Sequence, residues 1–259
     1  MIILPNASYQ NVVNEKVMTY QFLAQVGCPV FNSVLLEENE SITEEKIATI
    51  KCVLGSECCT VRYQYVKPCS NPVKGGNRVN LTVKDLISKM IDGTRMWLLQ
   101  PIDRTKNIYG INVMVNRVSK MFAIECVGKG FDVSDLNRGN ISPQENICFD
   151  YPIEYGVQNE WWKYVKISFV SSKQFQFDKM KRLQKLNAFG INSSLDIFDA
   201  EYEPLPFDIL EKLIHYAIRI DENWKISNEY VVSISMNMDG KLVFWDIQTP
   251  NGKMKILSK

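Results

Sequence analysis

The fold of this chain is best indicated by residues 231–248, which read VVSISMNMDGKLVFWDIQ. Two apolar segments rich in β-branched and aromatic residues, 231–236 and 241–247, lie on either side of a short polar turn. The turn contains Asp239-Gly240, a dipeptide that supplies the positive φ a tight hairpin needs. The pattern therefore predicts an antiparallel β-hairpin.

Outward from this hairpin, helical and strand patterns mix along the chain. Helices are predicted where apolar residues recur every three to four positions or a cap precedes them: at 14–26, at 42–54 behind a capping box that runs from Ser41 to Glu44, and at 206–220. Strands are predicted where apolar and β-branched residues gather or alternate, at 34–36, 59–65, 97–101, 109–115 and 120–127. Helices mixed with antiparallel strands indicate an α+β fold.

The composition is that of a globular protein without a strong electrostatic preference. The 259 residues are 46% hydrophobic and 23% charged, and the formal net charge is +1. This balance gives no reason to expect nucleic acid or an anionic membrane as a partner. No apolar run approaches the roughly 20 residues of a membrane span, and the N-terminus lacks a signal peptide's basic region, so a cytoplasmic protein is expected.

Seven cysteines and one histidine limit the kinds of site that the sequence can build. None of the cysteines forms a CxxC pair, which disfavours a zinc cage. Cys28 and Cys126 stand in apolar surroundings and are expected to be reduced, structural thiols. His215 falls on the charged side of the predicted helix 206–220, which disfavours hydrolase mechanisms that need an imidazole.

Four markers precede the hairpin in order along the chain. Lys16 lies near a helix start, eleven residues before Gly27, and Arg62 lies within a predicted strand. A glycine pair, Gly75-Gly76, follows Arg62 at thirteen and fourteen residues, and Gln100 ends the strand 97–101. Cations and glycine-rich backbone suit a phosphate ligand. A solvated lysine, a strand arginine that reaches solvent and a plain turn are the ordinary alternatives.

In this order the markers resemble the ATP-binding domain of phosphoenolpyruvate synthase and pyruvate phosphate dikinase, which belongs to the ATP-grasp superfamily. The segments 124–130 and 139–143, IECVGKG and GNISP, resemble that family's EAxxGLGE and GxVxPD elements. The resemblance spans roughly residues 14–250. It implies an ATP-grasp-like α+β fold in which two α+β lobes, 1–95 and 96–259, enclose a nucleotide cleft.

The resemblance also implies site residues, with ATP and Mg²⁺ as cofactors. Lys16, Arg62 and the Gly75-Gly76 loop would bind the phosphates, with Lys16 and Arg62 as catalytic residues, and Gln100 would meet the adenine edge. The hairpin would hold the metal through Asp246 and Gln248, the latter also in contact with the nucleotide. Three positions depart from the family pattern: Ser233 replaces a glutamate, Gln248 an arginine, and Asn112 a less polar residue.

Three functions are compatible with these residues. The first is a stand-alone ATP-grasp domain that binds Mg·ATP and transfers a phosphoryl group to a histidine of a separate partner protein or to a carboxylate. The second is a degenerate ATP-grasp domain that serves as a non-catalytic binding or scaffold module, for which Ser233 is the main reason. The third is an interaction protein whose aromatic residues Trp161, Trp162, Phe175 and Phe177 mark a partner surface.

Overall fold

The computed structural model divides the chain into two compact units, Met1–Arg104 and Thr105–Lys259. It describes residues 1–5, 15–37, 40–65, 77–84, 95–101, 107–128, 131, 133–137, 139, 141–150, 165–169 and 203–249. Each unit combines helices with one antiparallel sheet. The expected α+β class is therefore confirmed.

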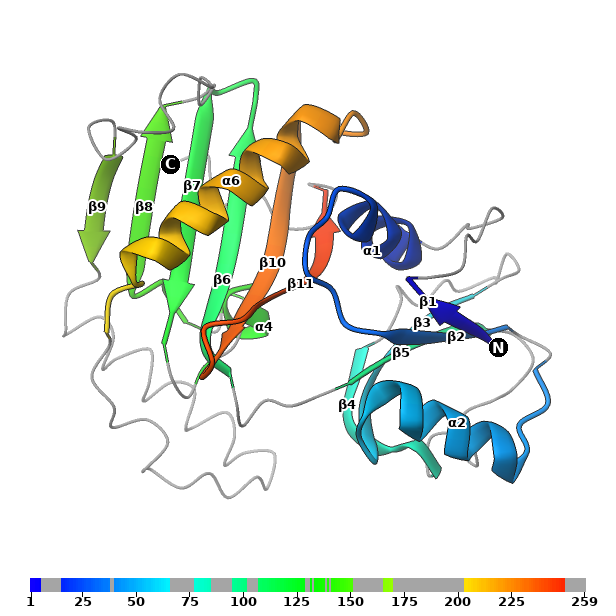
Figure 1. Cartoon of the computed structure of the whole chain (residues 1–259). Helices are drawn as coiled ribbons and strands as arrows, with labels where there is room; N and C mark the ends of the chain where they lie inside the picture. Colours follow the sequence, from blue (N-terminus) through cyan, green and yellow to red (C-terminus); the bar gives the residue numbers. More distant parts are fainter. Residues whose placement is uncertain are drawn as a thin grey trace. The chain divides into compact units, whose positions relative to one another are not determined.

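The first unit is built on a five-stranded antiparallel sheet with the strand order β1-β2-β5-β3-β4. Its strands are β1 (Ile2–Leu4), β2 (Ser33–Leu36), β3 (Cys58–Tyr65), β4 (Asn77–Thr82) and β5 (Arg95–Pro101). Two helices, α1 (Glu15–Gln25) and α2 (Glu44–Leu54), lie on opposite faces of this sheet (Figure 1).

Alternation along the strands divides the core of the first unit into two layers. On the face covered by α1, Val17 and Tyr20 of the helix pack with Leu4, Leu35, Met96 and Leu98. The neighbouring residues of the same strands point to the other face and pack against α2. That layer comprises Val34, Leu36, Ile50, Leu54, Cys59, Val61, Val83, Trp97 and Leu99.

The strand β5 belongs to the first unit, not the second. It pairs with β2 on one side and with β3 on the other. The sequence-based division at residues 95 and 96 would have assigned most of this strand to the second lobe. Its central place in the first sheet puts the division after Arg104.

The predicted cap of α2 was wrong by two residues. The helix begins at Glu44, and its N-cap is Thr43, whose hydroxyl accepts a hydrogen bond from the Lys46 amide at 3.3 Å. Ser41 lies outside the helix, where its carbonyl accepts a hydrogen bond from the Lys46 ammonium at 2.8 Å. The Lys46 side chain also bonds Glu40, so it holds this segment away from helical geometry.

The second unit is built on a six-stranded antiparallel sheet with the order β11-β10-β6-β7-β8-β9. Its strands are β6 (Asn107–Asn116), β7 (Met121–Val127), β8 (Glu145–Asp150), β9 (Val165–Phe169), β10 (Glu229–Asn237) and β11 (Leu242–Gln248). The helix α6 (Phe207–Asn223) crosses one face of the sheet (Figure 1). The short helix α4 (Val133–Asn137) contacts β6, β7 and β10. The predicted terminal hairpin is β10 and β11, and Gly240 has the expected positive φ of 71°.

The helix α6 packs on the sheet through the apolar stripe that its sequence predicts. The Tyr216 ring lies 5.1 Å from the Phe244 ring of β11, and His215 is exposed as expected. The buried residues of the stripe are Ile209, Leu210, Leu213, Ile214, Ala217, Ile218 and Ile220. None of the helices in the described ranges has both the length and the apolar character needed to cross a membrane.

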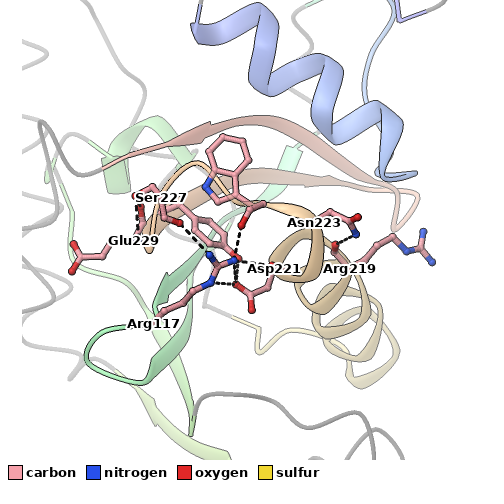
Figure 2. A network of polar contacts seen from close by, with 8 residues as sticks. Arg117, Arg219, Asp221, Asn223, Ser227 and Glu229 are labelled. Carbon is pink, nitrogen blue, oxygen red and sulfur yellow. Dashed lines mark hydrogen bonds and ion pairs between the residues drawn. The ribbon is translucent and has the colours of Figure 1, made fainter.

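One arginine binds the end of α6 to the sheet (Figure 2). The Arg117 guanidinium donates to the Asp221 carboxylate at 2.8 and 3.0 Å. It also donates to the carbonyls of Asp221 and Trp224, each at 2.7 Å, and of Ser227 at 3.4 Å. Tyr230 of β10 donates to the same Asp221 carboxylate at 2.7 Å. The guanidinium thereby satisfies carbonyls that a helix end leaves without intrahelical donors.

Candidate functional site

Four polar residues form a row across the second sheet, on adjacent strands. Asp246 of β11 pairs with Ser233 of β10, Ser233 pairs with Asn112 of β6, and Asn112 pairs with Glu125 of β7. Residues directly opposite each other in an antiparallel sheet point to the same face. These four residues, called the polar row below, therefore share one face of the sheet.

The polar row lies on the face opposite α6. The residues next to it along each strand are apolar, buried and point to the other side: Ile111, Val113, Ile124, Val232, Ile234 and Ile247. On that other side Phe244 meets Tyr216 of α6. The α4 residue Asn137 instead bonds Ser233, so α4 and the polar row are on the same side.

A β-bulge at Trp245 sets the direction of Asp246. Simple alternation along β11 would put Phe244, Asp246 and Gln248 on one face. The pairing shifts, however, because Ile234 lies opposite Phe244 while Ser233 lies opposite Asp246. The extra residue lets Phe244 face α6 and turns Asp246 and Gln248 to the other face. Bulges of this kind occur next to functional sites, where they redirect a side chain.

The Asp246 end of the row is held by amide hydrogen bonds. Asn137 Nδ2 donates to Ser233 Oγ at 2.9 Å, and Gln248 Nε2 lies 3.5 Å from the same oxygen. Gln248 Nε2 also lies 3.4 Å from Asp246 Oδ1. Since the amide nitrogen of Gln248 points toward Ser233 and Asp246, its oxygen Oε1 is available to another partner. Both lone pairs of the Ser233 hydroxyl are engaged, which leaves it no free acceptor.

These donors fit one hard divalent cation. The oxygens at this end of the row are those of the Asp246 carboxylate, which is 2% exposed, and Gln248 Oε1. Proteins bind Mg²⁺ through one or two carboxylates with the rest of the shell from water and substrate phosphates. Within the described ranges no group of three or more His, Cys, Asp or Glu gathers to form an all-protein metal cage. A cation here would therefore need oxygens from a ligand.

The other end of the row has acceptors without donors. The Oδ1 atom of Asn112 is buried and has no hydrogen-bond partner among the residues that the structure describes. Opposite it, burial raises the pKa of the Glu125 carboxyl to about 7. A carboxyl with a pKa near neutrality changes charge in the range where most proteins work.

Replacement of Glu125 by glutamine is expected to alter how stability depends on pH. The folded-state pKa is about 7, above the ordinary value of 4.5, so the unfolded state loses its proton first. The wild-type chain should lose stability as pH rises from about 4.5 through 7, by on the order of 2 kcal/mol. Glu125→Gln should match wild type near pH 4.5 and be more stable at pH 8.

Urea unfolding of both proteins between pH 4.5 and 8 would measure this difference. Glu229→Gln, at the end of β10, is a suitable control because this carboxylate lies outside the polar row and accepts a hydrogen bond from Asn116 at 2.7 Å. Parallel pH curves for wild type and Glu125→Gln would contradict the raised pKa.

In the first unit the sheet brings Arg62 and Gln100 onto one face. Thr60 pairs with Gln100 and Arg62 pairs with Leu98 across β3 and β5. Leu98 belongs to the layer under α1, so this face is the one that α1 covers. Gln100 is 1% exposed, and its Oε1 is buried without a hydrogen-bond partner among the described residues. Arg62 is half-buried.

The remaining predicted phosphate ligands are only partly placed. Lys16 lies in the first turn of α1, the helix on the face of Arg62 and Gln100, but its side chain is outside the described part. Gly75 and Gly76 lie outside the described residues, as do Trp161, Trp162, Phe175 and Phe177. The roles of all these residues stay predictions.

Two features of the candidate site were missed from the sequence. Glu125 was noted only as part of a segment, although a charged residue inside the apolar strand 121–127 is a usable signal. Asn137 was not singled out, because its bond to Ser233 joins residues 96 positions apart. Local patterns carry no information on such a contact.

No protein-family model matches the chain, and no curated protein matches it in sequence. Several solved structures resemble it in backbone. D-alanyl-alanine synthetase A from Vibrio cholerae O1 biovar eltor str. N16961 matches with 11% identity and a TM-score of 0.44, over 91% of this chain and 55% of that one. N5-carboxyaminoimidazole synthase from Aspergillus clavatus, in complex with ADP and 5-aminoimidazole ribonucleotide, matches with 10% identity and a TM-score of 0.45, over 90% and 43%.

A third structure, ACD1 of Ca. Korarchaeum cryptofilum in complex with coenzyme A, matches with 13% identity and a TM-score of 0.46, over 88% of each chain. The chain spans about half the length of the first two structures. At these identities and scores the similarities assign neither a family nor an activity. The ATP-grasp and dikinase resemblances therefore remain predictions.

Proposed function

We propose that this chain is an ATP-grasp domain that binds Mg·ATP for phosphoryl transfer to an acceptor on a separate molecule. The observation that carries the proposal is the bulge at Trp245, which turns Asp246 and Gln248 away from the apolar face and onto the face of the polar row. A buried carboxylate and an amide oxygen two residues apart suit one Mg²⁺ that also contacts phosphate oxygens.

The first unit carries the other residues that the sequence resemblance assigns to the nucleotide. Arg62 is a fixed cation on the α1 face, suited to bind phosphate oxygens, with Lys16 and the Gly75-Gly76 loop as its predicted partners. Gln100 Oε1 is a buried acceptor that the adenine amino group would satisfy. Bound Mg²⁺ would neutralise charge on the triphosphate, while these residues position it.

The acceptor is proposed to be a carboxylate or a histidine of a partner protein. The chain's own histidine, His215, is exposed on α6, and α6 lies on the face of the sheet opposite the polar row. It is therefore badly placed to receive a phosphoryl group from a nucleotide at Asp246. We therefore propose that the phosphoryl acceptor is a group other than the His215 imidazole.

A non-catalytic, nucleotide-binding module is the second candidate. The observation that favours it is Ser233, whose oxygen already accepts hydrogen bonds from Asn137 and Gln248. Since Ser233 is neutral and both of its lone pairs accept hydrogen bonds, the described residues provide one carboxylate, Asp246, for the metal. Such a site can bind a nucleotide without the charge needed for turnover.

Nucleotide binding can be tested with the unmodified chain. Millimolar Mg·ATP should raise the melting temperature by mass action, and isothermal titration should give a saturable heat. Adding EDTA should weaken binding if Asp246 and Gln248 hold the cation. A melting temperature unchanged by Mg·ATP, together with no heat in the titration, would remove the nucleotide proposal.

Arg62→Ala should weaken Mg·ATP binding more than it lowers stability. A charged hydrogen bond to phosphate contributes roughly 1.5–3 kcal/mol, which corresponds to about ten- to a hundredfold in affinity. The matched control is Lys84→Ala, which removes an exposed cation from the same unit. Equal affinities for the two variants would show that Arg62 does not bind the phosphates.

A further inference from the structure

At the Asn112 end of the polar row, the described residues leave one buried acceptor without a hydrogen-bond donor. Asn112 is 4% exposed, and its Oδ1 has no partner within the described part of the chain. A buried acceptor left without a donor destabilises a fold by roughly 1–3 kcal/mol. A ligand that donates a hydrogen bond to this atom would therefore remove that cost.

Glu125 adds a second acceptor next to the first. It pairs directly with Asn112, and in an antiparallel pair opposite Cβ atoms lie about 4.5–5.5 Å apart. No hydrogen bond or ion pair joins its carboxyl to another described residue. Burial is the cause of its raised pKa, which agrees with a carboxyl that has no cation near it.

Asn146 of β8 also pairs with Glu125 and carries an amide donor, but no hydrogen bond joins that amide to the Glu125 carboxyl. The flanking pairs are Gly110 with Val127 on one side and Met114 with Ala123 on the other. None of these four side chains carries a hydrogen-bond donor. On the adjacent strand, Ser233 accepts from Asn137 and Gln248, and no hydrogen bond joins its hydroxyl to Asn112 Oδ1.

We propose that Asn112 and Glu125 form a binding site for a primary ammonium group of a second ligand. An ammonium has three donors on one compact atom, so it can reach the amide oxygen and the carboxylate together. A guanidinium is wider and pairs with one carboxylate in a fixed fork, so it matches two acceptors on neighbouring strands less well. Neither residue is among those assigned to Mg·ATP, and the site is therefore independent of the proposed function.

The test uses the whole chain with propylammonium chloride as probe and 1-propanol as its neutral counterpart, at pH 8 and constant ionic strength. Ligand-observed NMR titration gives the two dissociation constants, and thermal unfolding gives a second measure of binding. Propylammonium should bind at least tenfold more tightly than propanol. Equal binding of the two probes would overturn the proposal.

Two variants locate the binding. Glu125→Gln removes the charge, and Asn112→Leu removes the acceptor with a side chain of similar size, so each should weaken propylammonium binding at least tenfold. Asn112→Leu should be no less stable than wild type, because it removes a buried acceptor without a donor. The control Glu229→Gln, a carboxylate on the same sheet that accepts from Asn116 at 2.7 Å, should bind like wild type.

The outcomes separate this site from the nucleotide site. Wild-type affinity for propylammonium in Glu125→Gln would overturn the ammonium proposal even if Asn112→Leu failed to fold. If the unmodified chain did not bind Mg·ATP, the proposed function would be overturned, and the ammonium result would be unaffected.

Discussion

Asp246→Asn is expected to lower the affinity for Mg·ATP by roughly a hundredfold or more while the fold is retained. The change is isosteric, and it removes the one carboxylate that the described residues offer at the Gln248 end of the polar row. Charge stabilisation by a carboxylate-bound metal amounts to several kcal/mol, which sets the size of the effect. Isothermal titration with ATP at several magnesium concentrations measures it, and any phosphoryl-transfer activity should disappear.

Two further variants help to interpret the effect of Asp246→Asn on Mg·ATP binding. Asp208→Asn, on the exposed side of α6 where Asp208 bonds Lys212 at 3.1 Å, is the matched carboxylate control and should bind Mg·ATP normally. Ser233→Glu restores a second acid and should steepen the dependence of binding on magnesium. ATP binding by wild type that does not depend on magnesium would favour the non-catalytic module over the enzyme.

Arg117→Ala is expected to destabilise the second unit by about 3 kcal/mol. The substitution removes five hydrogen bonds and leaves the half-buried Asp221 carboxylate without its cation. Loss of one partner from a buried or half-buried charged pair costs more than the pair contributes, because the remaining charge is poorly solvated. Urea unfolding followed by tryptophan fluorescence would measure the change.

Arg219→Ala is the matched control for Arg117. Arg219 lies on the exposed side of the same helix, and its carbonyl, which accepts from Asn223 at 2.8 Å, is unaffected by truncation (Figure 2). A change within about 0.5 kcal/mol is expected for it. If the two arginine variants unfolded at the same urea concentration, the network at the end of α6 would contribute little.

The terminal hairpin shows how a sequence-based pairing can be right for an incomplete reason. Counting six residues outward from Asp239-Gly240 places Ser233 opposite Asp246, and the structure confirms that pair. Near the turn, however, Met236 lies opposite Leu242, which is one residue out of step with that count. The bulge at Trp245 then restores the step. The one-residue register shifts made by the longer turn and by the bulge cancel each other, and the alternation of apolar residues alone could show neither of them.

Other parts were predictable to the extent that they depend on neighbours in sequence. The stripe of α6 and the strands β6 and β7 follow from apolar spacing, and the structure confirms them. The cap of α2 was misplaced because Ser41 and Thr43 are both good N-cap residues and the choice depends on Lys46. The Arg117–Asp221 bond joins residues 104 positions apart, so no local signal could indicate it.

The bulge in β11 also has a consequence for solubility. Among the described strands, β11 is at one edge of its sheet, where a flat strand would offer unpaired amides and carbonyls to a second molecule. An extra residue twists such an edge and interrupts the regular spacing that intermolecular pairing requires. Trp245, whose indole donates to Ser235 at 2.8 Å, fixes that irregularity. Deletion of Trp245 should therefore produce a chain that assembles edge to edge and precipitates at concentrations where the wild type stays monodisperse.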